Sequence, residues 1–175
     1  NIHKMLIVIE GIDGCGKTTV AETLKKKLEE KGYKVYLTKE PFNQKIKEVI
    51  REILEKEHEL NEYFGKILAL LFSADRHLHQ LEIKKKLSEG YIVISDRYYH
   101  SSFAYQTIYD GITVEFIKSI TPFLVKPDYV FILDIPVEVA LNRMSIRDRK
   151  TKYEEKEILE KVRENYLKLK DILKD

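Results

Sequence analysis

Three glycines, a lysine and two threonines stand close together near the start of the chain, in the stretch GIDGCGKTT. Glycine weakens the interior of any helix or strand, so three of them within six residues indicate a backbone that bends sharply or approaches a ligand closely. Residues 11–18 fit the pattern G-x-x-x-x-G-K-[ST] and directly follow an apolar run. In such a loop, backbone N–H groups surround phosphate at the positive end of the following helix. The stretch therefore predicts a nucleotide-binding loop.

Individual residues of this loop have different expected roles. Lys17 would neutralise charge on the β and γ phosphates, and the Thr18 hydroxyl would complete the shell of a Mg²⁺ ion that keeps several waters. Cys15 is expected as a filler, with a reactive thiol as the alternative. A glycine turn without function is the alternative for the whole loop. The expected nucleotide contacts are Gly11, Ile12, Asp13, Gly14, Cys15, Gly16, Lys17, Thr18 and Thr19.

The length and composition describe one globular domain without a strong overall charge. A chain of 175 residues with 43% hydrophobic composition predicts a single domain over residues 1–175. Lysine plus arginine (31) nearly balances aspartate plus glutamate (29), so the net charge of +2 predicts neither a nucleic-acid partner nor a membrane partner. The lone Cys15 excludes an intramolecular disulfide, and there is no membrane-spanning run or signal-peptide pattern. A cytoplasmic location is the prediction.

The alternation of short apolar runs with helical patterns predicts the fold class. Residues 5–9, 35–38, 91–95 and 129–133 have the length and β-branched content of buried parallel strands. Helical patterns cover residues 18–31, 44–56, 61–88, 136–144 and 156–173, and Gly32 and Gly90 are expected to end two of these helices. Together they predict an α/β protein with the P-loop NTPase fold, a central parallel sheet covered by helices on both faces.

The helix expected over residues 61–88 has more apolar residues than one buried face requires. Two explanations stay open. The helix packs partly against a second copy of the chain, or it is a central helix fully enclosed by its own domain. A homodimer is the prediction.

Other residues indicate which kind of phosphate-loop protein this is. The N-K-x-D element of GTPases and the L-S-G-G-Q element of transporter ATPases are both absent. A small-molecule kinase needs instead an arginine-rich acceptor pocket and a mobile arginine-bearing flap. Asp96 and Arg97 follow the third expected strand, and the carboxyl ends of strands in doubly wound sheets face the ligand crevice. Both side chains are therefore expected to point toward the phosphates.

The sequence from residue 96 onward matches a known pattern. Residues 96–98 read D-R-Y, Ser101 follows, and residues 104–106 read A-Y-Q, and with these the chain resembles the thymidylate kinase family. The stretches EGIDG at 10–14 and FSADR at 72–76 agree, as do Arg143 and Arg147. The resemblance covers most of the chain. It implies phosphorylation of deoxythymidine monophosphate (dTMP) to the diphosphate in dTTP biosynthesis, with ATP as donor and Mg²⁺ as cofactor.

The resemblance also implies an acceptor site. Phe72 would stack on the thymine base and Arg76, one helical turn away, would hydrogen-bond its carbonyl edge. Ser102 would lie near the ring nitrogen, and Tyr105 would lie under the sugar and disfavour a 2′-hydroxyl. The structural alternative makes Phe72 a core residue and Arg76 a solvated surface charge.

The phosphates and the metal have implied ligands as well. Arg97 and Arg51 resemble arginines that hold the acceptor phosphate, although Arg51 alone would be read as a helix surface residue. Asp13 resembles a loop carboxylate that acts with Mg²⁺ and the acceptor sugar, with a plain surface aspartate as the alternative. Asp96 resembles a carboxylate that orients Arg97 and the water shell of the metal bound by Thr18.

The basic segment at about residues 143–154 resembles the lid of this family, with a solvated loop as the alternative. Some members have a catalytic arginine inside the phosphate loop, where this chain has Gly14 and Cys15. The resemblance therefore assigns that part to Arg147 or Arg149, which would close onto the transferring phosphoryl group. Arg143 is the candidate contact to the donor nucleotide.

Two features depart from the family pattern. T-R-E-P-G-G-T appears as TKEPFNQ at residues 38–44, without its arginine and both glycines, and no apolar run for a fifth strand follows residue 173. Either the sheet lacks an edge strand or part of the C-terminus is not included. Two other functions stay open, a kinase for another (deoxy)nucleoside monophosphate or a nucleoside, and an ATP-binding module without catalysis.

Overall fold

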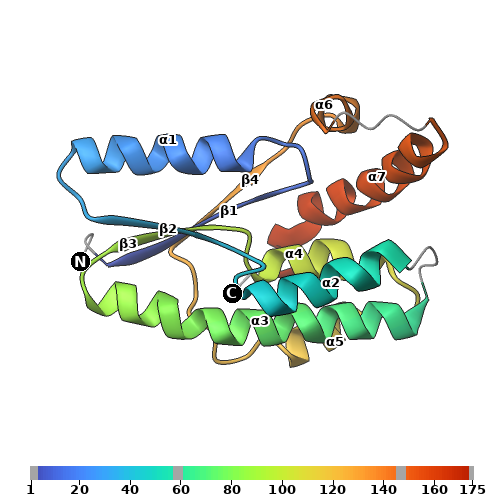
Figure 1. The fold of residues 1–175 in the computed structure, drawn as a ribbon, viewed down its shortest axis with the longest axis horizontal. Coiled ribbons are helices and arrows are strands. Elements are labelled where there is room, and N and C mark those ends of the chain that lie inside the picture. The colour runs from blue at the N-terminus through green and yellow to red at the C-terminus, as the bar shows by residue number, and fades with distance from the viewer. Residues whose placement is uncertain (1–3, 57–60, 145–148, 174–175) are drawn as a thin grey trace.

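A computed structural model describes residues 4–56, 61–144 and 149–173, and at its centre lies a parallel sheet. The strands are β1 (Met5–Gly11), β2 (Val35–Lys39), β3 (Ile92–Asp96) and β4 (Tyr129–Leu133), in the order β2-β3-β1-β4 (Figure 1). Each neighbouring pair is parallel, and Ile9 of β1 lies opposite Asp96 of β3. The strands predicted from the four apolar runs are confirmed.

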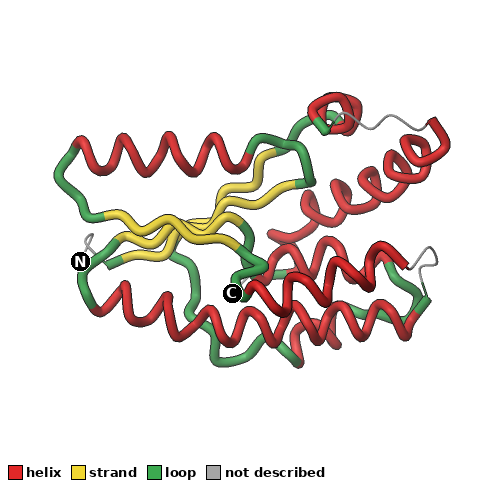
Figure 2. Tube along the Cα trace, viewed as in Figure 1, coloured by secondary structure: helices red, strands yellow, loops and turns green. Residues whose placement is uncertain are grey.

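Helices cover both faces of this sheet, as Figure 2 shows, and the predicted α/β class is confirmed. They are α1 (Lys17–Glu30), α2 (Gln44–Lys56), α3 (Glu62–Ser88), α4 (Tyr99–Tyr105), α5 (Val114–Ser119), α6 (Val137–Arg143) and α7 (Arg149–Ile172), with a 3₁₀ turn η1 (Gln106–Ile108). The sequence predicts no helix at α4 or α5, because so few residues show no helical repeat. α7 begins earlier than predicted, because the polar residues before 156 have no apolar repeat.

Alternation along β1 distributes its side chains between the two faces of the sheet. Ile7 and Ile9 pack on the α1 side with Ala21, whereas Leu6 and Val8 pack on the α3 side with Ile83. All but the first residue of β1 are buried. A central strand buried on both faces explains why its sequence reads as a continuous apolar run.

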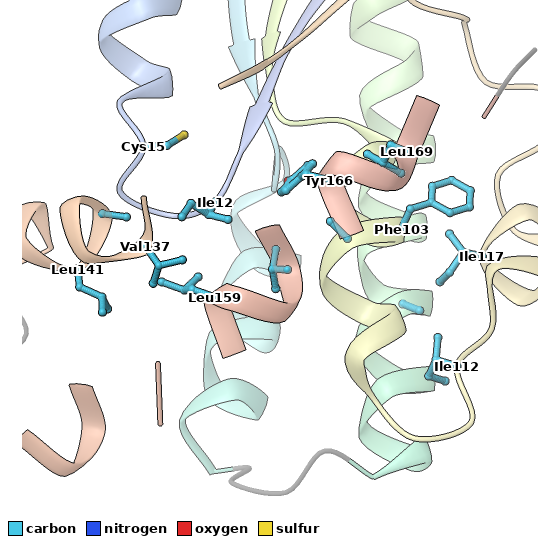
Figure 3. Close-up of a cluster of buried hydrophobic side chains, with 14 residues drawn as sticks. Ile12, Cys15, Phe103, Ile112, Ile117, Val137, Leu141, Leu159, Tyr166 and Leu169 are labelled. Carbon is cyan, nitrogen blue, oxygen red and sulfur yellow. The ribbon is translucent and has the colours of Figure 1, made fainter. Parts of the chain in front are cut away.

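A third apolar cluster lies beside the sheet, among α4, α5, α6 and α7 (Figure 3). Ile12 of the phosphate loop belongs to it together with Phe103 of α4, Val137 of α6 and Val162 of α7. The loop after β1 is therefore packed against helices that lie more than 90 residues later in the sequence.

α3 is apolar on the outside as well as on the inside. Tyr63 and Leu81 are 72% and 71% exposed, and Ile67, Leu70 and Leu78 are also exposed, whereas Leu68 and Ile83 are buried. The explanation that the helix is fully enclosed by its own domain is therefore wrong for this chain.

Gly32 and Gly90 follow α1 and α3 with positive φ values of 92° and 87°, as expected for helix-ending glycines.

Over the residues that the structure describes, no helix combines the length and the apolar character needed to cross a membrane.

Gly65 of α3 lies where that helix meets the segment after η1. A Cβ atom at this position would come within 2.5 Å of Tyr109 Cβ and 2.6 Å of Ile112 Cγ1. A methyl group here therefore meets two side chains at distances that force the helix or the segment to move.

Gly65→Ala is expected to lower the free energy of unfolding by about 1–3 kcal/mol, because it overpacks this contact. Helix propensity alone would raise stability by up to about 1 kcal/mol, so the sign of the change decides between the two effects. Denaturant unfolding of both proteins measures it. Lys66→Ala, at the exposed neighbouring position, serves as control and should stay within about 0.5 kcal/mol of the parent. An unchanged or raised stability of the alanine variant contradicts the close contact.

Candidate active site

A cavity of about 290 Å³ opens at the carboxyl ends of β1, β2 and β3, next to the N-terminus of α1. This is the edge at which parallel sheets of this type bind ligands. Its lining residues are Asp13, Gly14, Gly16, Lys17, Thr18, Thr19, Lys39, Glu40, Asp96 and Arg97. The structure therefore brings the predicted phosphate loop together with the predicted Asp96 and Arg97.

The glycines of the loop are required by its neighbours as well as by its conformation. Gly14 and Gly16 have positive φ values of 80° and 94°, which residues with a Cβ rarely adopt. A Cβ at Gly14 would lie 2.5 Å from the carbonyl oxygen of Ala140, and one at Gly16 would lie 2.7 Å from Arg143 Nη1. The guanidinium of Arg143, at the end of α6, thus lies against the loop where α1 begins.

Lys17 is folded back over the phosphate loop. Its ammonium donates a hydrogen bond of 3.3 Å to the carbonyl oxygen of Ile12 and lies 3.8 Å from Cys15 Sγ. Burial lowers the pKa of Lys17, and the charge of Arg97 lowers it further. A partly desolvated ammonium ion next to a second cation is suited to receive an anionic ligand. Cys15 of the loop is buried and packs in the same apolar cluster as Ile12.

Thr18 and Asp96 are joined across the cavity. The Thr18 hydroxyl donates a hydrogen bond of 3.2 Å to Asp96 Oδ2. Hydroxyl and carboxylate oxygens are ligands that Mg²⁺ prefers. Among the described residues no group of three or more histidine, cysteine, aspartate or glutamate side chains could hold a metal ion. Mg²⁺ typically keeps several waters and binds through one or two protein groups and substrate phosphates, so this pair fits its needs.

Arg97 projects into the cavity from a strained backbone. Its φ of 77° lies in the left-handed region, which costs a non-glycine residue about 1–3 kcal/mol. The Nη2 atom forms an ion pair with Asp13, which is half exposed. The Nη1 atom donates to the Gly11 carbonyl at 3.3 Å and to the Ser101 hydroxyl at 3.0 Å. These contacts hold Arg97 beside the phosphate loop.

Glu10, the residue before the loop, is fully buried. Its carboxylate accepts hydrogen bonds from the backbone N–H groups of Tyr98 (2.8 Å) and Ser101 (3.1 Å). It also accepts from the Ser101 hydroxyl at 2.6 Å and the Tyr166 hydroxyl at 2.8 Å. Burial by itself would raise the pKa of Glu10, but His100, Arg97 and the Ser101 hydrogen bonds outweigh it and lower the pKa to about 2.

Sequence reasoning did not single out Glu10 or Tyr166 as individual site residues. One signal was available for Glu10, namely an acidic residue at the end of an otherwise apolar buried strand. Nothing in the sequence indicates Tyr166, because it lies 69 positions after Arg97 on a charged helix.

Arg76 of α3 is 3% exposed, so the alternative of a solvated surface charge is wrong. Its Nε donates to Glu40 Oε1 at 2.7 Å, its Nη1 to the Ser102 hydroxyl at 3.1 Å and its Nη2 to the Tyr98 carbonyl at 3.2 Å. The two predicted acceptor residues Arg76 and Ser102 are therefore in direct contact. The second oxygen of Glu40 lies 2.8 Å from Nδ1 of His79.

The altered loop after β2 is held by contacts with α3. Asp75 accepts hydrogen bonds from the backbone N–H groups of Phe42 (2.7 Å) and Asn43 (2.6 Å). The Phe42 ring stacks on the buried His79 ring at 4.5 Å between centroids. Burial raises the pKa of Asp75, although these two N–H bonds lower it. These contacts fix the backbone of the altered loop against α3.

The remaining predicted residues fall into three groups. Tyr105 accepts a hydrogen bond of 2.8 Å from the backbone N–H of Asp13, and its ring faces the Arg97 guanidinium at 5.1 Å, so it belongs to the site. Phe72 is half-buried on α3, and Arg51 is exposed on α2. Arg147 lies outside the described residues, and the structure describes the backbone but not the side chain of Arg149, so their predicted catalytic part stays a prediction.

A parallel sheet with a glycine-rich loop at the end of its central strand, followed by a lysine at the start of a helix, defines the class of P-loop nucleotide-binding proteins. Within this class the chain belongs to the thymidylate kinase family. The family model described as "Thymidylate kinase" matches residues 9–174. The resemblance inferred from the sequence is confirmed.

Individual relatives agree with this assignment. A probable thymidylate kinase of Thermococcus kodakarensis is 46% identical over 178 residues, which cover 96% of this chain and 85% of the relative. A probable thymidylate kinase of Methanocaldococcus jannaschii is 43% identical over 96% of this chain and 82% of the relative. The crystal structure of thymidylate kinase from Ehrlichia chaffeensis superposes with a TM-score of 0.71 at 31% identity, covering 95% and 86% of the two chains. The P-loop NTPase fold is thereby confirmed.

Glu10→Gln is expected to reduce the pH dependence of stability. The pKa of Glu10 is lowered from 4.5 to about 2 in the folded chain, so its charge stabilises the fold above pH 4.5 and this stabilisation is lost as the pH falls toward 2. It amounts to about 3 kcal/mol at neutral pH. Denaturant unfolding of the parent should show a larger drop in the free energy of unfolding between about pH 5 and pH 3 than the variant does.

The exposed Glu52 of α2 provides the matched control, and Glu52→Gln should retain the pH profile of the parent. Equal acid sensitivity of the parent and Glu10→Gln would show that the buried carboxylate does not stabilise the folded chain.

Proposed function

We propose that this protein is an ATP-dependent thymidylate kinase, which transfers the γ-phosphoryl group of ATP to dTMP and produces dTDP for dTTP synthesis. One observation carries the proposal. Lys17 of the phosphate loop and Arg97 of the acceptor side line the same cavity of about 290 Å³. Two nucleotide phosphates that approach from opposite sides would meet between these cations. Because the chain belongs to the thymidylate kinase family, we infer that the donor is ATP and the acceptor is dTMP.

The donor side is formed by the phosphate loop and α1. Backbone N–H groups at the start of α1 would bind the β and γ phosphates, with Lys17 as counter-ion. Arg143, which lies against Gly16, would contact the donor nucleotide. Thr18 and Asp96 would hold the Mg²⁺ ion, directly or through its waters, and the ion would neutralise charge on the transferring phosphate.

The acceptor side combines Arg97 with the residues around Arg76. Arg97 would bind the monophosphate of dTMP, assisted by Arg51. Arg76 and Ser102, already joined by a hydrogen bond, would read the edge of the thymine ring while Phe72 stacks on its face. Tyr105 faces Arg97 and would lie under the deoxyribose. Arg147 or Arg149 would complete the charge neutralisation during transfer.

The chemistry then needs little beyond positioning. An oxygen of the dTMP phosphate is already anionic, so no side chain has to act as a strong base. It attacks the γ-phosphorus of ATP, and the bond from that phosphorus to the bridging oxygen of ADP breaks. Lys17 and Arg97 would offset the repulsion between the two anionic substrates, and a Mg²⁺ ion held by Thr18 and Asp96 would supply further charge neutralisation. Asp13 would orient Arg97 through their ion pair.

Lys17→Ala is expected to lower kcat by about 10²- to 10³-fold, because it removes a charge that stabilises the transferring phosphoryl group. A coupled assay with dTMP, ATP and Mg²⁺ measures the change. Lys26→Ala, at an exposed position of α1, is the control and should retain the activity of the parent. Unchanged turnover by Lys17→Ala would refute the assigned part of this residue.

The same assay tests the substrate. We expect the thymidine and deoxyuridine monophosphates to be phosphorylated well above those of cytidine and guanosine. A preference for another monophosphate or for a nucleoside would identify a different acceptor. ATP binding without any acceptor-dependent turnover would indicate a module without catalysis.

We also infer that two copies of the chain associate through α3. The exposed apolar residues of this helix recur at spacings of three, four or eight positions and so share one face, opposite to the buried Arg76 and His79. Contiguous exposed apolar surface of this kind marks protein interfaces. They are Tyr63, Ile67, Leu70, Leu78 and Leu81.

Leu70→Glu is expected to convert a dimer into a monomer, because it places a charge in the middle of this face. Light scattering coupled to gel filtration measures the mass. Leu167→Glu, at an exposed leucine of α7, is the matched control and should remain dimeric. A monomeric parent protein, or a Leu70→Glu variant that stays dimeric, contradicts the proposed interface.

Two further properties are part of the proposal. We infer that residues 1–175 act as a single nucleoside monophosphate kinase domain, because one sheet and its three packed clusters include elements from both ends of the chain. We infer a cytoplasmic location, which is supported by the single buried thiol and by the use of ATP.

A further inference from the structure

We propose that Tyr166 of α7 is a positioning residue, which together with Glu10 holds one side of the Arg97 guanidinium so that the other side receives the phosphate of the acceptor nucleotide. This inference rests on the proposed function, in which Arg97 binds that phosphate. Tyr166 comes from a helix far along the chain, and its hydroxyl group reaches the end of the central strand.

The Tyr166 hydroxyl connects a buried anion with a cation. It donates to Glu10 Oε1 at 2.8 Å and accepts from Arg97 Nη1 at 3.3 Å. Ser101 makes the same pair of contacts, donating to Glu10 Oε1 at 2.6 Å and accepting from Arg97 Nη1 at 3.0 Å. Since each hydroxyl gives its proton to Glu10, its oxygen is free to accept from the guanidinium. The two hydroxyls therefore bridge Glu10 and Arg97 and fix the guanidinium relative to the buried carboxylate.

The two ends of the guanidinium have different surroundings. Nη1 has three oxygen acceptors, Gly11, Ser101 and Tyr166, and the Glu10 carboxylate lies 4.0 Å away. Nη2 is paired with Asp13, whose side chain is 54% exposed at the cavity. Nη1 is thus bound to groups that cannot move without opening the core, whereas Nη2 faces the space where a ligand binds. A phosphate oxygen entering beside Asp13 would meet a donor that is already oriented.

The chemistry of Tyr166 is consistent with a permanent hydrogen-bond donor. Burial raises the pKa of its hydroxyl, and the nearby Glu10 charge raises it further. The ring is 3% exposed and belongs to the apolar cluster that contains Val162 and Leu169 of the same helix (Figure 3). Packing therefore fixes the ring, and Tyr166→Phe removes only the hydroxyl.

The test compares ligands with and without the phosphate. Calorimetry measures the binding of dTMP and of thymidine, which lacks the phosphate, to the parent protein and to Tyr166→Phe. We expect the variant to bind dTMP roughly 3- to 10-fold more weakly while its affinity for thymidine stays unchanged. In the kinase assay the KM for dTMP should rise by a similar factor, and the KM for ATP should stay unchanged.

Val162→Ala is the matched control, since it weakens the packing of α7 one turn earlier without touching the hydroxyl. It should leave the ratio of the dTMP and thymidine affinities unaltered. If Tyr166→Phe does not yield folded protein, Ser101→Ala removes the other bridging hydroxyl and should change the same ratio in the same direction.

The outcomes separate this inference from the proposed function. A parent protein that phosphorylates dTMP, combined with a Tyr166→Phe variant that loses thymidine and dTMP affinity equally or not at all, overturns the positioning role alone. A parent protein that does not phosphorylate dTMP overturns the proposed function. A parent protein that phosphorylates dTMP but binds thymidine as tightly as dTMP overturns the role of Arg97, and with it the positioning role of Tyr166, because Arg97 then contributes nothing to phosphate binding.

Discussion

A fully buried negative charge at the end of the central strand is the interaction on which the site depends. An isolated carboxylate in an apolar interior is very costly, so Glu10 must be surrounded by donors. These come from the backbone at Tyr98 and Ser101, from the Ser101 hydroxyl and from Tyr166. Satisfying one charge thereby joins β1, the start of α4 and α7 at a single point. Arg97 lies beside this point and shares two of its hydroxyl groups.

A second buried glutamate, Glu40, holds another arginine of the site, Arg76. Glu40 stands directly after β2, is buried, and holds Arg76 through one oxygen and His79 through the other. Each of the two buried or partly buried arginines assigned to the acceptor therefore lies next to a buried glutamate at the carboxyl end of a strand, Arg76 in direct contact with Glu40 and Arg97 linked to Glu10 through two hydroxyl groups. Removing one partner of such a pair leaves an uncompensated charge in the interior. This explains how flexible side chains become fixed donors around a cavity open to solvent.

The fold and much of the site could be predicted from local patterns. Continuous apolar runs identified the strands, and the glycine spacing identified the loop between β1 and α1, because both properties depend on neighbouring residues. The contacts among Arg76, Glu40 and Ser102 could not be predicted, since they join segments separated by 26 and 36 positions. The short helices α4 and α5 were missed for a related reason, because packing rather than a helical repeat stabilises them.

The amino-acid sequence by itself determined which groups are available and the family to which the chain belongs. Loop chemistry, strand periodicity and the order of the elements are local properties of neighbouring residues. Only the tertiary structure decided which arginine contacts which carboxylate, that Asp75 holds the backbone of the loop after β2, and that α3 keeps an apolar outer face. These outcomes depend on burial, and burial is set by how distant elements pack together.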